Sequence, residues 1–446
     1  MMTCLPVLAG IVFGVSALAQ GNRASVTVQQ PVPPASAQPL VPHTIHLANG
    51  RSLTLNLPEG FTIDLALQGL RRVRFLTKSP DNRIFVTDMN SLSDNFKGAV
   101  YILEGWNDTT HTFARKVAYL DHLRNPNNVV FYTDAGGQSW LYLATTDKLL
   151  RYKYTAGDQA PTSAPQILAT YPDYGLNYKY GGWHLTRTVA IANLHGQPKL
   201  YVAVGSSCNA CKEGEEIRAT LSVMDPDGSH PVIMARGLRN AVGLMAVPSN
   251  TSFPGGALFA TNMGADHLGN RAPQDTFFEV DNAQHPLRTD TNYGWPTCYF
   301  DGGRAHPDTR ISAPKPEDHT VPAPPAGPAP PQFDCSKVPA AFTAFAAHSS
   351  PLALAWFGDD SPLLKDTFLV ALHGASRLSI GTGYRVVRFS PANRKPEDFI
   401  TGFLTKAKGK LIVAGRPCGI LQTGPDSFLL TDDHDGAIYF VHPSSH

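Results

Sequence analysis

The chain has 446 residues, with 37 Lys or Arg against 36 Asp or Glu, so its formal net charge is +1. This balance provides no overall electrostatic field for nucleic acid or an anionic membrane, and no nucleic-acid partner is expected. The 38 glycines and 37 prolines are typical of a turn-rich fold, and a small molecule is the favoured class of ligand.

The N-terminal 19 residues contain an apolar run, residues 5–18, that ends in Ala17-Leu18-Ala19. This pattern is typical of a secretory signal peptide and is shorter than the ~20 residues of a membrane span. Residues 20–41 are polar and Pro-rich and predict a linker, so residues 42–446 form the folded domain. We therefore expect a periplasmic or secreted protein with no integral membrane segment after signal cleavage.

A short strand pattern with a central aromatic residue recurs along the domain. The aromatic positions are separated by 57, 59, 58, 109 and 60 residues. A β-rich unit that repeats every ~40–60 residues is typical of propeller blades, whereas sandwich strands recur every ~8–12 residues. The predicted fold class is therefore all-β, a six-bladed β-propeller. The six copies are Ile84-Phe85-Val86, Leu141-Tyr142-Leu143, Leu200-Tyr201-Val202, Leu258-Phe259-Ala260, Thr367-Phe368-Leu369 and Ser427-Phe428-Leu429.

The interval of 109 residues is too long for one blade, and its excess falls in a Pro-rich, polar stretch at about 304–339. We interpret this stretch as an insertion between blades. Propellers are usually closed by pairing the two chain ends, and the alternating segment 44–57 is a candidate closing strand. An unpaired N-terminal arm explains the alternation equally well.

Five cysteines follow the signal peptide. Cys208 and Cys211 could form a redox or metal pair, but no histidine cluster in the sequence completes a zinc site, which favours a local disulfide. Cys298 and Cys335 flank the Pro-rich insertion, where a disulfide would lower the entropy of a long loop. Cys418 is left over and is expected to be a buried free thiol.

Four polar segments come from four different blade units, where loops would converge at one end of the propeller channel. Together they supply an imidazole, fixed cations, an amide and an oxygen-rich turn, which suit a polyanionic planar cofactor. The segments are GGWHLTRT at 181–188, GLRNAVGL at 237–244, NMGADHLGN at 262–270 and GRPCG at 415–419.

With four further motifs and residues 427–439, these segments resemble the soluble quinoprotein sugar dehydrogenases, particularly the sorbosone and aldose dehydrogenase-like branch. The further motifs are VGSSCN at 204–209, NYGWP at 292–296, HSSPL at 348–352 and TGYRVV at 382–387. The shared order extends from about Leu57 to Val441. It implies a six-bladed propeller that binds pyrroloquinoline quinone (PQQ) and calcium, and that oxidises an aldose or sorbosone-like sugar at C1 by hydride transfer to PQQ.

Within this resemblance, His184 matches the general base that takes the proton of the sugar hydroxyl. Arg239 and Asn240 match residues that hold the quinone and stabilise charge on its C5 oxygen. Arg416 matches a ligand of a cofactor carboxylate. Without the resemblance, a loop histidine and solvated arginines would be the default interpretation.

Two further cofactor contacts come from one turn, where the branch usually has His-Gly-Ser-Trp-Asn-Arg. Here His373 and Gly374 are followed by Ala375-Ser376-Arg377, so the arginine lies one residue early. Because the guanidinium side chain is long, Arg377 is still expected to reach a cofactor carboxylate.

The family's calcium turn matches Gly264-Ala265, with Asp266 beside it. Backbone carbonyls and carboxylates are the hard oxygen ligands that calcium prefers, and the bound ion would polarise the quinone. Asp266 either binds the ion directly or caps the turn.

Two other function classes remain open. A calcium-dependent sugar lactonase would need carboxylate and Asn side chains around the metal but would not need Arg239 or Arg416. A non-catalytic binding propeller would keep only the blades. Because Cys211 is followed by Lys212, the pair is no haem-attachment motif, and a dehydrogenase would pass its electrons to a separate acceptor.

Overall fold

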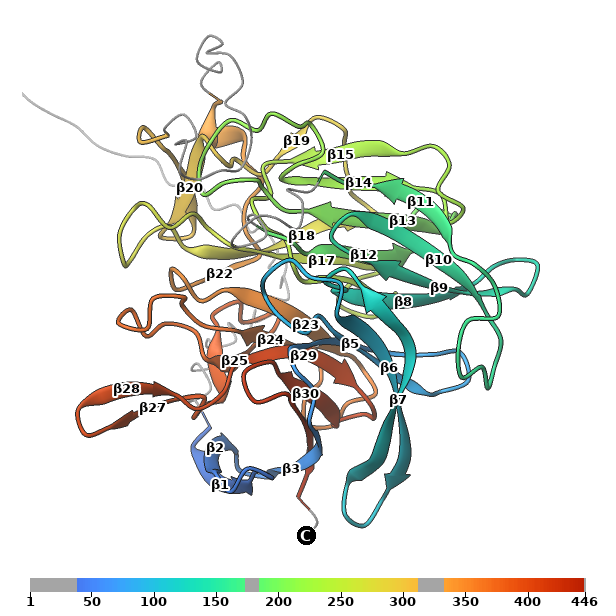
Figure 1. Ribbon diagram of the computed structural model, residues 1–446. Helices are drawn as coiled ribbons and strands as arrows, with labels where there is room; N and C mark the ends of the chain where they lie inside the picture. The colour runs from blue at the N-terminus through green and yellow to red at the C-terminus, as the bar shows by residue number, and fades with distance from the viewer. Residues whose placement is uncertain (1–37, 173–183, 312–332, 445–446) are drawn as a thin grey trace, which may run out of the picture. The chain divides into compact units, whose positions relative to one another are not determined.

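The computed structural model describes residues 38–172, 184–311 and 333–444. Within these ranges the regular elements are strands and one 3₁₀ turn, η2 (Cys335–Lys337), and no helix is long and apolar enough to cross a membrane. Six antiparallel sheets form the six blades of a β-propeller, which confirms the predicted fold class (Figure 1). The expected signal peptide, residues 20–37 of the linker, and Gly181, Gly182 and Trp183 lie outside the described residues.

We number the blades along the chain, and the strands of each blade follow one another in sequence except at two places discussed below. Blade 1 has β4 (Val73–Lys78), β5 (Ile84–Asp88), β6 (Gly98–Asn107) and β7 (Thr112–Leu123). Blade 2 has β8 (Asn128–Thr133), β9 (Ser139–Ala144), β10 (Lys148–Tyr154) and β11 (Gln166–Thr170). Blade 3 has β12 (Arg187–Ala192), β13 (Lys199–Val204), β14 (Thr220–Met224) and β15 (Val232–Arg236).

Blade 4 has β16 (Leu244–Val247), β17 (Ala257–Asn262), β18 (Asp275–Asn282) and β22 (Thr343–Phe345). Blade 5 has β23 (Pro351–Phe357), β24 (Thr367–Leu372), β25 (Arg385–Phe389) and β26 (Glu397–Ile400). Blade 6 has β29 (Pro417–Gln422), β30 (Phe428–Asp432), β31 (Ala437–Pro443) and, from the start of the domain, β3 (Phe61–Gln68). A separate hairpin, β27 (Leu404–Ala407) and β28 (Lys410–Val413), connects blades 5 and 6.

The recurring aromatic motif marks the second strand of every blade. Five of the six aromatic residues are 0% exposed and Tyr201 is 2% exposed. These side chains also meet across blades, as where the rings of Phe259 in blade 4 and Phe368 in blade 5 lie 4.7 Å apart, edge to face. The motif is therefore a packing signal, because burial of each such ring contributes about 1.5–3 kcal/mol to folding.

Threonine hydroxyls at the ends of second strands join one blade to the next. Each accepts a hydrogen bond from a backbone N–H of its own first strand or the loop before it, and donates to a backbone carbonyl of the following blade or its leading loop. These hydroxyls fix the inner strands that lead into the channel loops. They are Thr87 (from Phe75, to Asn127), Thr261 (from Gly243, to Leu352) and Thr431 (from Gly419, to Arg74), with distances of 2.6–3.1 Å.

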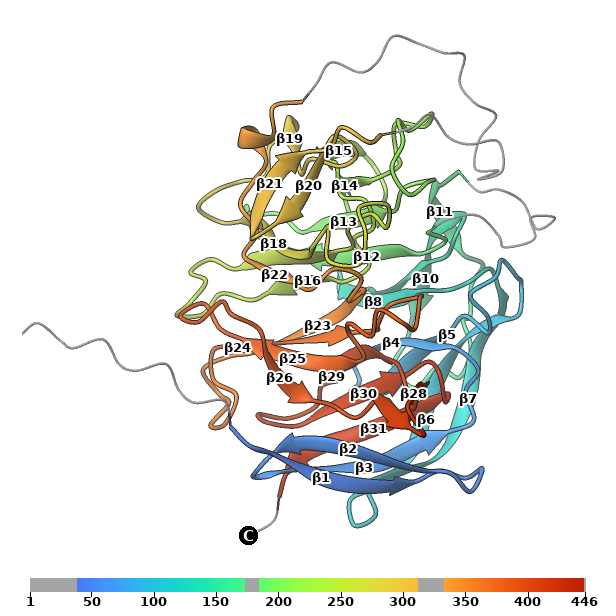
Figure 2. The same cartoon turned by 90° about the vertical axis from the view of Figure 1, so that its left-hand side faces the viewer.

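The propeller is closed by β3, which pairs antiparallel with β31 from Phe61↔Pro443 to Gln68↔Ala437 (Figure 2). The prediction that segment 44–57 is the closing strand is therefore wrong, and so is the alternative of an unpaired arm. That segment belongs to a hairpin of β1 (Leu40–His46) and β2 (Ser52–Pro58), a two-stranded sheet of its own.

The alternation in β2 reflects burial against blade 5 rather than ring closure. Leu53, Leu55 and Leu57 are 0–2% exposed and pack in the core cluster that contains Phe399 of β26. Asn56 also exchanges backbone hydrogen bonds with Thr401 (2.9 and 3.0 Å). The next residue, Gly402, has φ +106°, and a Cβ there would collide with the carbonyl oxygen of Thr54. Glycine is thus required where the hairpin lies against blade 5.

The Pro-rich insertion lies inside blade 4, between its third strand β18 and its outer strand β22, rather than between two blades. The excursion contains β19 (Thr291–Asn292), which pairs with β15 of blade 3, and the hairpin of β20 (Cys298–Asp301) and β21 (Arg304–Pro307). Residues 312–332 are outside the described residues.

Both expected disulfides are present. Cys298 is bonded to Cys335 across the insertion, and Cys208 is bonded to Cys211 in a local disulfide, which leaves neither thiolate for a metal. Cys418 is a buried free thiol, as predicted, and burial raises its pKa to about 12.

Candidate active site

His184 lies just before β12, with a left-handed backbone (φ +46°) that turns its ring toward β13. Its Nδ1 is 3.0 Å from the carbonyl oxygen of Ser206 and 2.9 Å from the hydroxyl Oγ of the same residue. Because the Ser206 hydroxyl itself donates to the carbonyl of Cys208 (2.7 Å), Nδ1 must carry a proton and donate it. In the neutral ring the lone pair is then on Nε2.

The charge state of His184 is set by its surroundings. Burial, followed by the positive charge of Arg239, holds the pKa of His184 well below its usual value of 6.5. The imidazole is thus neutral at neutral pH, which is the form that a general base requires.

Arg239 follows β15 and is only 3% exposed. Its Nε donates to the backbone carbonyl of Asn209 (2.8 Å), and its Nη2 donates to the Asn209 Oδ1 (3.0 Å) and approaches Oδ2 of Asp266 (3.4 Å). Asn209 is held between the two half-cystines Cys208 and Cys211. The guanidinium therefore has one fixed orientation, set by a short disulfide-closed loop.

Asn240 and His184 approach each other on either side of Gly205. The Asn240 amide donates to Sδ of Met263 (3.3 Å), and its backbone N–H donates to Oδ1 of Asn262 (3.1 Å). A Cβ at position 205 would lie 2.6 Å from Oδ1 of Asn240 and 2.6 Å from Cβ of His184. No side chain fits there, so Gly205 is what allows the imidazole and the amide to share one site.

If the chain is the quinoprotein sugar dehydrogenase that its motifs imply, replacing Gly205 by Ala is expected to displace His184 or Asn240 and to lower turnover by about 10²-fold, because misplacement of a catalytic group by ~1 Å has an effect of this size. The measurement is sugar-dependent dye reduction at saturating quinone, with thermal unfolding as the check on the fold. Gly136→Ala, in an exposed turn of blade 2, is the matched control and should be unaffected. Normal turnover of the Gly205 variant would contradict the shared site.

The candidate calcium turn is held in place by hydrogen bonds to the side chain of Asp275. The backbone N–H of Gly264 donates to Oδ1 of Asp275 (2.7 Å), and the N–H of Ser350 donates to Oδ2 (2.8 Å). Asp275 is 2% exposed, and burial raises its pKa to about 7 despite these two hydrogen bonds. This carboxylate therefore joins the turn after β17, in blade 4, to the loop that leads into blade 5.

The side chain of Asp266 is about half exposed and lies between Arg239 and His348. Besides Arg239, its Oδ1 is 2.9 Å from Nδ1 of His348, whose Nε2 lies 2.8 Å from the carbonyl oxygen of Gly269. Its backbone N–H donates to Oδ1 of Asn209 (2.8 Å). Asp266 thus connects the calcium turn to the loop that orients Arg239.

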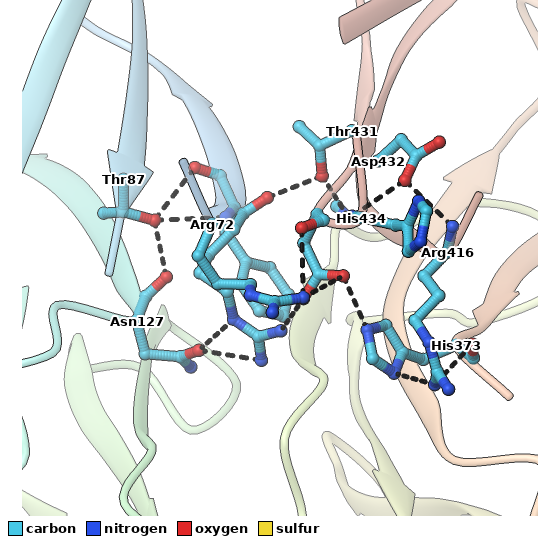
Figure 3. A network of polar contacts seen from close by, with 12 residues as sticks. Arg72, Thr87, Asn127, His373, Arg416, Thr431, Asp432 and His434 are labelled. Atoms are coloured by element: carbon cyan, nitrogen blue, oxygen red, sulfur yellow. Dashed lines mark hydrogen bonds and ion pairs between the residues drawn. The ribbon is translucent and has the colours of Figure 1, made fainter. Parts of the chain in front are cut away.

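A second group of charged residues surrounds Asp433, which follows β30. Oδ1 of this buried carboxylate lies 2.8 Å from Nε2 of His373, and Arg72 (3.5 Å) and Arg74 (3.4 Å) also pair with it. Burial raises the pKa of Asp433, but His373 and the two arginines outweigh this and lower it. Figure 3 shows the network, which extends from Thr87 and Asn127 to His373 and Arg416.

Arg416 stands over the ring of Tyr384, 4.7 Å from its centroid. Its two terminal nitrogens donate to the carbonyls of Gly374 (3.1 Å) and Ala375 (3.2 Å) and to the Tyr384 hydroxyl (2.9 Å). Arg377, from the same turn, is exposed, and no side-chain hydrogen bond or ion pair of it is seen within the described residues.

The structure therefore places the residues expected from the sequence in two groups. His184, Arg239, Asn240 and the turn of Gly264, Ala265 and Asp266 form one, and His373 and Arg416 belong to the other. From the second group, Arg74 donates to Asn127 (3.3 Å), and Asn127 donates to Thr188 of β12 (2.9 Å). The Thr188 hydroxyl then donates to the carbonyl of Val242 (2.7 Å), two residues after Asn240 of the first group.

Several residues in these contacts were not foreseen from the sequence, and four of them hold the groups in place most directly: Ser206, Asn209, Asp275 and Asp433. Ser206 and Asn209 lie in a motif that carries the resemblance, and Asp433 follows the last repeated strand, so their positions held a signal. Their roles did not, because three of them act on backbone groups or through their own backbone carbonyls.

Comparison with known proteins agrees with this architecture. A family model described as TrAA12-like matches residues 55–444 of this chain. No curated protein matches the chain.

Three solved structures illustrate the fold that is shared. The PQQ domain of pyranose dehydrogenase from Coprinopsis cinerea, in its holo form, is 17% identical, with a TM-score of 0.62 over 87% of this chain and 97% of that one. The calcium structure of a Trichoderma reesei carbohydrate-active enzyme of family AA12 is 17% identical, with a TM-score of 0.63 over 87% and 96%. The PQQ-bound aldose sugar dehydrogenase of Streptomyces coelicolor is 14% identical, with a TM-score of 0.50 over 87% and 100%.

The family match spans both groups of charged residues and all six blades. The resemblance seen in the sequence motifs is thus confirmed, and the chain belongs to the TrAA12-like family of quinoprotein sugar dehydrogenases.

Proposed function

We propose that this protein oxidises an aldose or sorbosone-like sugar at C1, with PQQ as the hydride acceptor and His184 as the general base. The observation that carries the proposal is the convergence of a neutral imidazole and an amide at Gly205, with the buried guanidinium of Arg239 close enough to lower the pKa of that imidazole. A base beside fixed positive charge is the arrangement that proton removal coupled to hydride loss needs.

The donor set suits the cofactor chemically. A quinone with three carboxylates needs cations and hydrogen-bond donors that are already oriented. Each of four such residues is held by a protein contact of 2.8–3.3 Å: Arg239, Asn240, His373 and Arg416. We propose that Arg239 and Asn240 contact the cofactor near its reacting quinone carbonyl. Arg416, His373 and Arg377 would bind the carboxylates of the cofactor.

His184 performs the proton transfer in this proposal. Its Nδ1–H is committed to Ser206, so Nε2 is the atom that accepts the proton from the sugar hydroxyl as the C1–H bond is lost. When bound, PQQ supplies the acceptor for the hydride. Arg239 provides a positive charge that is fixed in place and already desolvated, so it stabilises developing negative charge without reorganisation.

We also propose a calcium ion at the turn of Gly264, Ala265 and Asp266. The support is that Asp275 holds the Gly264 N–H at 2.7 Å, which fixes the turn, and that backbone carbonyls and the Asp266 carboxylate are hard oxygen donors. Direct binding by the Asp266 carboxylate would require it to exchange its contacts with Arg239 and His348.

Cofactor dependence tests the function as a whole. Protein prepared without PQQ is expected to be inactive in sugar-dependent dye reduction, to gain activity with PQQ and calcium, and to lose it with a chelator. Calcium should restore the chelated enzyme more fully than magnesium, which prefers a smaller octahedral site.

The same samples distinguish the other function classes. Lactone hydrolysis with calcium alone, without PQQ, would favour the lactonase alternative, and PQQ binding without dye reduction would favour a binding propeller. We further propose that the protein acts in the periplasm or outside the cell, where its two disulfides would persist, and passes electrons to a separate acceptor.

A further inference from the structure

A cluster of two histidines and one aspartate lies on blade 6 and blade 1, outside the candidate active site. Asp64 belongs to β3, His442 to β31, and His111 to the turn between β6 and β7. One possible ligand atom from each residue lies within 4.8 Å of the others. The three come from segments far apart in the sequence that meet where the propeller closes (Figures 1 and 2).

The pairing of the closing strands brings Asp64 and His442 to the same face. His442 is opposite Thr62 in the β3–β31 register, and Asp64 is two residues farther along β3. Side chains two apart on a strand share a face, so Asp64 is the diagonal neighbour of His442. The β6–β7 turn brings His111 to this pair, and Nδ1 of His111 lies 2.8 Å from Oδ2 of Asp64.

The hydrogen bonding of His442 requires a positive group between it and Asp64. Its Nδ1 lies 2.9 Å from the carbonyl oxygen of Pro443, an acceptor, so Nδ1 must carry a proton. Its Nε2 lies 2.9 Å from Oδ2 of Asp64, which also only accepts when ionised. A neutral imidazole has one N–H, so the second contact needs either another proton or a cation on Nε2.

We propose that Asp64, His111 and His442 bind one divalent transition-metal ion, for which zinc is the reference. Two imidazoles and one carboxylate are a common protein ligand set for zinc, whereas calcium prefers oxygen ligands. The Pro443 carbonyl supplies the outer hydrogen bond that orients a ligating histidine and leaves Nε2 for the metal.

The site is accessible and its histidines are constrained. The side chains of Asp64, His111 and His442 are 40%, 27% and 13% exposed, so an ion can enter from solvent and water can complete its coordination. Phe440 stacks on His442 at 4.8 Å, and Trp106 stacks on His111 at 6.2 Å. The aromatic rings limit rotation of both imidazoles and reduce the entropy lost on binding.

The bound ion would fasten blade 1 to the strands that close the propeller. His111 is the contribution of blade 1, and the other two ligands are on β3 and β31 of blade 6. Because the unfolded chain does not hold these three ligands together, binding favours the folded state and should raise Tm.

Zinc binding tests the site directly. Metal-stripped protein without PQQ is dialysed against zinc in excess calcium, which occupies the proposed calcium turn, and bound zinc is measured by elemental analysis. We expect one zinc per chain that is lost, or bound more than about tenfold more weakly, in Asp64→Asn and His111→Ala. His230→Ala, which breaks an exposed His–Asp pair in blade 3, is the control and should keep the zinc.

Thermal unfolding of the same samples tests the fastening. Zinc should raise the Tm of the wild type and of His230→Ala but not that of His111→Ala, which lies in a surface turn. Equal zinc binding by all variants, or none by the wild type, would reduce the cluster to a hydrogen-bonded group and overturn the site. Bound zinc with no rise in Tm would overturn its fastening role. Neither readout uses the quinone or sugar, so both are independent of the proposed dehydrogenase activity.

Discussion

The His184→Ala variant is expected to lose about 10²–10⁴-fold in turnover while it keeps its fold and binds PQQ normally. The imidazole is the only group of the site described above whose geometry and charge state both suit proton removal, since Nδ1 is tied to Ser206 and the ring is neutral. Turnover should be measured at saturating PQQ, with cofactor occupancy measured separately. His184→Gln, which keeps a polar side chain but no comparable base, should behave like His184→Ala.

A matched histidine separates this effect from a general loss of packing. His195 is in the same blade, bonded to Asp281 at 3.0 Å, and His195→Ala should leave turnover unchanged. If His184→Ala turned over normally at full occupancy, His184 would be structural and another group would take the proton.

The pH dependence of the wild type follows from the same residue. Because burial and Arg239 lower the pKa of His184, protonation of the base should begin to reduce kcat/KM only below pH 6.5. The unfolded chain takes up this proton near pH 6.5 whereas the folded chain does not, so the contribution of His184 to stability falls as pH drops below that value. A kcat/KM profile with its acid limb above 6.5 would contradict the assignment.

Replacement of Arg239 should weaken PQQ binding and lower turnover together, by about 10²–10³-fold in turnover at saturating cofactor. The guanidinium is buried and fixed by Asn209, so Arg239→Ala removes a positioned charge and one of the two side chains that contact the Asp266 carboxylate among the described residues, the other being His348. Arg239→Lys should recover little, because an ammonium group cannot donate to both oxygens of Asn209 in a fork.

The measurements are PQQ affinity by equilibrium titration and dye reduction at full occupancy. Arg236→Ala is the control, because Arg236 is close in sequence, about half exposed and paired with Glu216. Unchanged affinity and turnover in Arg239→Ala would show that the arginine only supports the loop around Asn209.

The blades could be predicted from the sequence because each second strand is covered by neighbours on both faces. This leaves an aromatic residue flanked by apolar ones at a steady interval, as at Phe85 and Tyr142. The closing strand could not be predicted in this way. β2 and β3 both alternate, and alternation reports a buried face without naming the strand or blade that covers it.

The site was predictable to the extent that its side chains act directly. His184 and Arg239 stand in motifs that carry the family resemblance, whereas the carbonyl of Asn209 that holds Arg239 belongs to the backbone and has no signature in the sequence. The contact of Asp275 with the Gly264 N–H depends on how β18 lies beside the turn after β17, which no local sequence pattern reports.

The pairing of β3 with β31 has a consequence for how the chain matures. On a ribosome, β3 emerges 369–382 residues before the residues of β31 that it pairs with, so it must wait, with both edges unpaired, for nearly the whole chain to follow. Until then blade 6 is incomplete, and β3 offers a free edge to other chains. A nascent chain of this kind has a long period of exposure to aggregation, and a protein shortened by the length of β31 would remain in that state permanently.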